Sequence, residues 1–69
     1  MQYKKLKVLI VDDASLVIER LSEMFSELEC VKEVMAAMGY DEAISIISSY
    51  KPDVVLLDIH LQKKTELNY

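Results

Sequence analysis

The sequence has very little cysteine, glycine and proline, with one residue of each type among its 69 residues. A single cysteine, Cys30, cannot form an internal disulfide, which fits a reducing cytosol; we expect a cytoplasmic protein in which Cys30 is a small buried or half-buried apolar side chain. The "VDDAS" stretch has no glycine, so it cannot form the glycine-rich loop that cradles phosphate in nucleotide-binding βαβ units.

Long apolar runs and excess positive charge are also missing. No stretch is long enough to span a bilayer, and residues 6–11 are too short for the apolar region of a signal peptide. Twelve acidic residues outnumber eight basic ones, which gives a net charge of −4. We therefore expect neither nucleic acid nor a membrane surface as a partner.

Apolar residues, by contrast, are abundant, at 52% of the chain. A chain of this length forms at most one small domain and buries only about 60% of the surface that it exposes when unfolded. The sequence therefore predicts a single domain over residues 1–69, with a polar tail at 62–69 and more apolar surface than one copy can hide.

The first half of the chain alternates between two hydrophobic periods. The β-branched segment Leu6–Val11 predicts a strand. Residues Ser15–Leu28 predict a helix, because apolar side chains recur there at spacings of three and four. The residues of that apolar face are Val17, Ile18, Leu21, Met24, Phe25 and Leu28. Glutamates on the opposite side (Glu19, Glu23 and Glu27) indicate a solvated helix face.

The second half repeats the alternation. A second strand is predicted over Cys30–Ala37, a turn at Gly39, a helix capped by Asp41 that runs to Ser49, and a third strand over Asp53–Leu57. The inner face of that helix is predicted to carry Ala43, Ile44 and Ile47. The order β-α-β-α-β predicts an α/β fold with parallel strands and right-handed crossovers.

Carboxylates follow two of the predicted strands. Asp12 and Asp13 come directly after the first strand, and Asp58 follows the third. If these strands are neighbours, the three side chains meet at the carboxyl edge of the sheet, where open α/β sheets bind ligands. Clustered oxygen ligands suit a hard divalent cation, so we expect Mg²⁺. Helix capping is the alternative, and it explains one aspartate more readily than three.

The stretches "VLIVDDASLVIERL" and "GYDEAISIISSYKPDVVLLDIHL" resemble the amino-terminal half of a two-component response regulator receiver domain, over residues 5–61. The resemblance implies a truncated flavodoxin-like sheet with three parallel strands in the order 2-1-3. It also implies that Asp58 is the phosphoryl acceptor and Asp13 a direct Mg²⁺ ligand. Asp12 would act mostly through water, and the backbone carbonyl of His60 would be a further ligand.

The implied function is phosphorelay signalling, with a sensor histidine kinase or a phosphotransfer protein as the partner and with no enzymatic turnover. In that family the start of the first helix faces the kinase, which here corresponds to Ala14, Ser15 and Ile18. A phosphatase or dehalogenase of the haloacid-dehalogenase type is disfavoured, because that family carries Asp-x-Asp after its first strand whereas Asp12 and Asp13 are adjacent.

Several family features do not occur in these 69 residues. They are the hydroxyl residue of strand 4, the lysine of strand 5, and the Pro-Gly that follows the acceptor. A second hypothesis is therefore a truncated receiver that is not phosphorylated and acts as a self-associating or kinase-binding module. We expect it to form homo-oligomers through the third strand and through exposed sheet faces, where Leu9, Val11, Val55 and Leu57 would lack covering helices.

Overall fold

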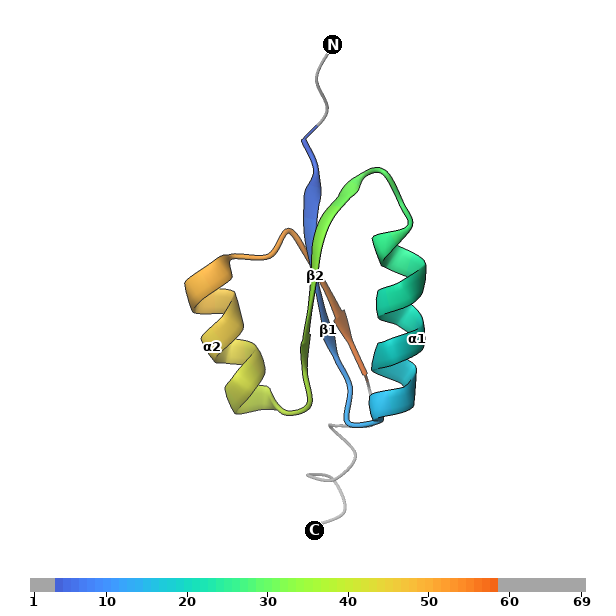
Figure 1. The fold of residues 1–69 in the computed structure, drawn as a ribbon. Helices are drawn as coiled ribbons and strands as arrows, with labels where there is room; N and C mark the ends of the chain where they lie inside the picture. The colour runs from blue at the N-terminus through green and yellow to red at the C-terminus, as the bar shows by residue number, and fades with distance from the viewer. Residues whose placement is uncertain (1–3, 59–69) are drawn as a thin grey trace, which may run out of the picture.

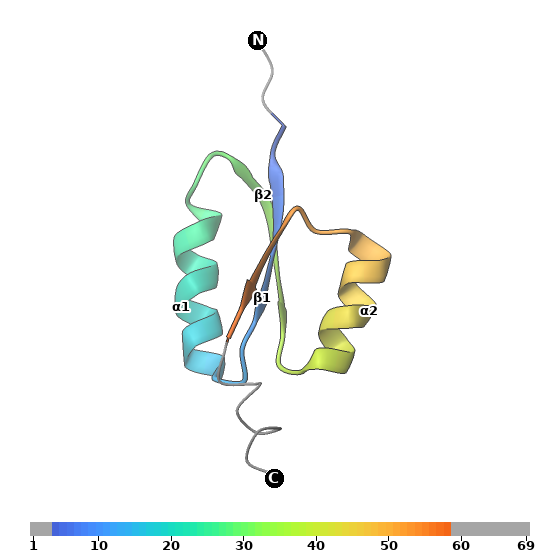
Figure 2. The same ribbon diagram turned by 180° about the vertical axis from the view of Figure 1, so that it is seen from behind.

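The structure is a computed structural model, and it describes residues 4–58. Three parallel strands lie in the order β2-β1-β3 and alternate with two helices along the chain. Helix α1 lies on one face of the sheet and α2 on the other, as both views show (Figures 1 and 2). The elements are β1 (Leu6–Val11), α1 (Ser15–Ser26), β2 (Val31–Ala37), α2 (Tyr40–Tyr50) and β3 (Val54–Leu57).

The expected fold class, an α/β sheet with three parallel strands in the order 2-1-3, is confirmed. Element boundaries differ from the prediction by one or two residues, as is usual at fraying helix ends. The predicted polar tail at 62–69 lies outside the described residues.

Strand β1 is the centre of the core. Its residues Val8 to Val11 are each at most 2% exposed, because β2 and β3 flank the strand and a helix covers each face. The expected exposure of Leu9 and Val11 is therefore wrong. On β3, by contrast, Val55 and Leu57 are 42% and 47% exposed, as expected for an edge strand, since neither helix contacts β3.

The two helices bury less of their apolar faces than the periodicity predicts. On α2, Ala43 is buried and Ile46 packs against the core, whereas Ile44 and Ile47 are exposed. The predicted inner face is therefore wrong for both exposed isoleucines, because a three-stranded sheet is too narrow to cover a wide apolar stripe. The predicted apolar face of α1 is divided in the same way: Ile18, Leu21 and Phe25 are half-buried, and Val17 and Met24 are exposed. Leu28, which was predicted to belong to this face, lies beyond the end of the helix and is exposed.

Two local predictions are also corrected. Cys30 is exposed, because it lies in the turn that precedes β2. Asp41 does not cap α2, since the N-cap residue is Gly39 and no side chain bonds to the helix from that position. Glu42 instead accepts a hydrogen bond from the backbone N–H of Met38 at 3.1 Å. No helix within residues 4–58 is both long and apolar enough to cross a membrane.

Asp53 fixes the start of β3 against β1. Its Oδ2 accepts a hydrogen bond from the backbone N–H of Lys7 at 2.9 Å, and its Oδ1 lies 2.8 Å from Nζ of Lys4. The backbone N–H of Asp53 in turn donates to the carbonyl of Lys7 at 2.8 Å. The bond from Lys4, followed by that from Lys7, holds the pKa of the Asp53 carboxyl below its ordinary value.

A depressed carboxyl pKa makes stability depend on pH in a defined direction. The contribution of Asp53 is complete above its unfolded-state pKa and is lost as the pH falls through its lower folded-state pKa. Between about pH 5 and pH 3 we expect the free energy of unfolding to fall more steeply in the wild type than in Asp53→Asn. Urea denaturation at a series of pH values measures both slopes. Lys4→Gln should flatten the profile in part, and identical slopes in all three proteins would contradict the assignment.

Candidate metal and phosphoryl-acceptor site

The carboxyl ends of β1 and β3 lie side by side. Val11 pairs with Leu57 in the parallel register, and the backbone N–H of Asp58 donates to the carbonyl of Val11 at 2.9 Å. The residue after each strand therefore emerges at the same edge of the sheet. The N–H of Asp12 donates to the carbonyl of Ala37 at 3.0 Å, which ties this edge to β2 as well.

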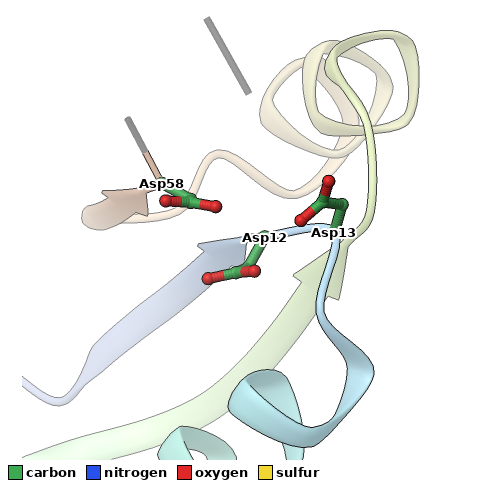
Figure 3. Close-up of side chains that lie close together, drawn as sticks. All are labelled: Asp12, Asp13 and Asp58. Atoms are coloured by element: carbon green, nitrogen blue, oxygen red, sulfur yellow. The ribbon is translucent and has the colours of Figure 1, made fainter. Parts of the chain in front are cut away.

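The three predicted aspartates form one cluster at that edge. Each of Asp12, Asp13 and Asp58 offers a carboxylate oxygen, and these oxygens all lie within 4.8 Å of one another. Figure 3 shows the carboxylate of Asp58 at the end of β3, opposite those of Asp12 and Asp13 in the segment after β1. Asp12 and Asp58 are half-buried, and Asp13 is exposed. His60, whose carbonyl was expected to be a ligand, lies outside the described residues.

None of the three aspartates is the N-cap residue of α1. The N-cap residue of α1 is Ala14, and no side-chain cap bond is made there. Asp12 instead accepts a hydrogen bond from the backbone N–H of Ala14 at 2.8 Å through its Oδ1. This bond closes an Asx turn, which fixes one oxygen of Asp12 in the loop between strand and helix. The sequence prediction did not include this turn, although an aspartate two residues before the N-cap of a helix is its usual signal.

Three carboxylates this close repel one another, and a divalent cation among them relieves that repulsion. The donor set is oxygen only and one of its members is exposed, so a bound ion could keep water ligands as Mg²⁺ prefers. The residues therefore fit a magnesium ion. Acidic side chains gathered at the carboxyl edge of an α/β sheet define a class of α/β module whose ligand site lies at that edge.

Comparison with known proteins identifies the family within that class. The family model described as the response regulator receiver domain matches residues 8–66. The chain belongs to this family. The resemblance expected from the aspartates and the third strand is thereby confirmed.

Several curated proteins are similar to the chain. The positive alginate biosynthesis regulatory protein of Pseudomonas aeruginosa is 47% identical over 58 residues, which cover 81% of this chain and 23% of that protein. The sensory transduction protein LytT of Enterococcus faecalis is 44% identical over 54 residues, covering 78% and 22%. Protein-glutamate methylesterase/protein-glutamine glutaminase 2 of Vibrio vulnificus is 35% identical over 69 residues, covering 100% and 20%.

The chain thus spans only about a fifth of the length of the curated relatives that it matches. No solved structure was found to match the chain. Membership of the family supports phosphorelay signalling in general, and receiver domains of this family typically interact with histidine kinases or phosphotransfer proteins.

Magnesium should stabilise the folded chain if the acidic cluster binds it. At a free Mg²⁺ concentration ten times its dissociation constant, we expect the free energy of unfolding to rise by about 1.4 kcal/mol. Asp13→Asn should lose most of this gain, because it removes one charged ligand. Glu23→Gln, which removes a charge from the exposed side of α1, should keep it. Thermal unfolding with and without Mg²⁺ measures the difference, and an equal gain in both variants would rule out the cluster as the binding site.

Proposed function

We propose that this chain is an Mg²⁺-dependent phosphoryl acceptor of a phosphorelay, with Asp58 as the acceptor. The observation that carries the proposal is the cluster of three carboxylates at adjoining strand ends, within a chain that belongs to the receiver family. A sensor histidine kinase or a phosphotransfer protein is the proposed donor. A cytoplasmic location, which the single cysteine favours, is part of the same proposal.

The geometry supports one ion site shared by the three aspartates. Asp12, Asp13 and Asp58 would hold the ion, with the carbonyl of His60 as a further ligand. When bound, Mg²⁺ supplies positive charge that offsets the charge on the phosphoryl oxygens. Asp12 is fixed by its bond from the N–H of Ala14, and Asp58 is fixed through its backbone bond to Val11.

The proposed step transfers a phosphoryl group from a histidine nitrogen of the donor protein to a carboxylate oxygen of Asp58. A carboxylate oxygen of Asp58 attacks the phosphorus of a phosphohistidine, a P–O bond forms and the P–N bond breaks. The electron pair of that bond returns to the imidazole nitrogen, which then takes a proton, and the product is an aspartyl phosphate. The first turn of α1 begins two residues after Asp13, so Ala14, Ser15 and Ile18 are proposed to contact the donor protein. The methylesterase activity in the names of some relatives is not carried over to these 69 residues.

Incubation with Mg²⁺ and acetyl phosphate, followed by intact-mass spectrometry, tests the acceptor. The wild type should gain one phosphoryl group, and it should gain none when EDTA removes Mg²⁺. Asp58→Asn should gain none under any condition, because its amide is not a nucleophile. Asp41→Asn, a matched substitution on α2, should behave as the wild type does. Absence of a gain in a folded wild-type sample would reject the acceptor role and leave the aspartates as at most a metal site.

A second candidate function is a self-associating or kinase-binding module that is not phosphorylated. The observation in its favour is the exposed side chains of β3: Val54 is 37% exposed, Val55 42% and Leu57 47%. Among the described residues β3 pairs only with β1, so its other edge offers unpaired backbone groups beside apolar side chains. Exposed apolar edge strands of this kind favour pairing with another chain.

Sedimentation of the 69-residue chain at tens of micromolar tests this second function. We expect a dimer or a larger assembly in the wild type, and a shift toward monomer in Val55→Lys, because a charge on an edge strand opposes pairing. Ile47→Lys, which places the same charge on an equally exposed position of α2, should leave the assembly unchanged. A monomeric wild type that unfolds cooperatively would contradict self-association.

A further inference from the structure

Basic residues collect at the end of the sheet opposite the aspartates. A depression of about 530 Å³ is lined by Lys4, Lys5, Lys7, Lys32, Lys51 and Asp53. It therefore contains five of the eight basic residues of a chain that carries twelve acidic ones. Its volume lies within the range of about 300–1,000 Å³ that is typical of small-ligand sites.

The topology explains how residues distant in sequence meet there. Lys4 and Lys5 precede β1, Lys32 is the second residue of β2, and Lys51 follows α2 just before β3. Because the strands are parallel, all their amino ends share one edge, in the same way that their carboxyl ends share the other. The five lysines thus come from β1, from β2, and from the segments that precede β1 and β3.

Two backbone irregularities contribute to this gathering. Leu6 pairs with Val31 but Lys7 pairs with Glu33, so Lys32 is the extra residue of a register shift in β2. Such bulges re-aim a side chain relative to a regular strand. Lys51 has φ of 51° and is the one non-glycine residue with positive φ among residues 4–58. Two lysines of the depression, Lys32 and Lys51, lie neither in β1 nor just before it. Both therefore occupy irregular backbone.

Most of this positive charge is not neutralised. The one salt bridge within residues 4–58 joins Lys4 to Asp53, and the second oxygen of Asp53 is taken by the backbone N–H of Lys7. The ammonium of Lys7 donates to the carbonyl of Tyr50. Lys5, Lys32 and Lys51 have no ion pair or side-chain hydrogen bond among the described residues. Three exposed ammonium groups facing one depression repel one another unless an anion lies between them.

We propose that this basic depression binds a compact, multiply charged phosphate anion, at a site separate from the aspartate cluster. A compact anion fits better than a nucleic acid, because a duplex carries one charge per about 1.7 Å and needs an extended basic track. Carboxylates lie beside the depression, because Lys32 also lines a neighbouring hollow together with Glu19, Glu23 and Glu33. A long polyanion would meet these carboxylates, whereas a short phosphate chain would not.

Isothermal titration with sodium tripolyphosphate at low salt tests the proposal. EDTA is present, so that the aspartate cluster cannot recruit phosphate through a metal ion. Lys32→Gln should weaken binding about threefold, and the triple variant Lys5→Gln, Lys32→Gln, Lys51→Gln at least about tenfold. These side chains are exposed and have no partner among the described residues, so the variants should fold, as circular dichroism would check. Asp53→Asn removes the one carboxylate of the depression and should tighten binding.

Arg20 provides the matched control. It is the one basic residue within residues 4–58 that does not line the depression, and Arg20→Gln removes the same charge as Lys32→Gln. Equal losses in these two variants would overturn the proposal, since binding would then follow net charge alone. Tighter binding of a DNA duplex or of anionic vesicles than of tripolyphosphate would also overturn it.

The source of the phosphate chain can be distinguished in the same experiment. Equal affinity for adenosine triphosphate and tripolyphosphate would identify the phosphate chain as the recognised group. Tighter binding of adenosine triphosphate would indicate that the site recognises a phosphate chain carried by a nucleotide. Because phosphorylation of Asp58 is assayed with Mg²⁺ and this binding is assayed without it, failure of one proposal leaves the other standing.

Discussion

The hydrogen bonds that β1 makes with a strand on each side determine the rest of the structure. They bury Val8 to Val11 almost completely, although only two helices cover the sheet. They also fix a register in which Val11 lies beside Leu57, so that the residues that follow emerge together. The acidic cluster at the carboxyl edge depends on this register, because a slip of one residue would turn Asp58 to the opposite side of its strand.

The same pairing separates charge along the sheet. Three carboxylates lie at the carboxyl ends of the strands, and five lysines line a depression at their amino ends. Neither group is visible as a run in the sequence, since its members are spread over more than forty positions. A net charge of −4 therefore describes the chain poorly as a binding surface. Local gathering by the fold, more than overall composition, decides which partner each end attracts.

The sequence was enough to predict those parts of the structure that depend on hydrophobic periodicity and on which residues follow each strand. Alternating apolar segments predicted the order of elements, and the aspartates directly after two strands predicted their meeting at one edge. The exposure of side chains was predicted less well. Ile44 and Ile47 belong to the apolar pattern of α2 yet are exposed. The apolar pattern of a helix does not show how wide a surface the helix packs against. The Asx turn of Asp12 and the register shift at Lys32 depend on backbone detail that no hydrophobic pattern encodes.

Among the described elements β3 comes last along the chain, and this has a consequence for how the chain folds. β3 is four residues long and contacts only β1, from which it is 46 positions distant at the Lys7–Asp53 bond. Closing so long a loop costs chain entropy before any contact compensates for it, so β3 is expected to dock after β1, α1 and β2 have formed. Asp58 joins the other two aspartates only at that last step. The acidic cluster is therefore an intrinsic reporter of completed folding: a chain whose third strand has not yet docked has the aspartates but no site.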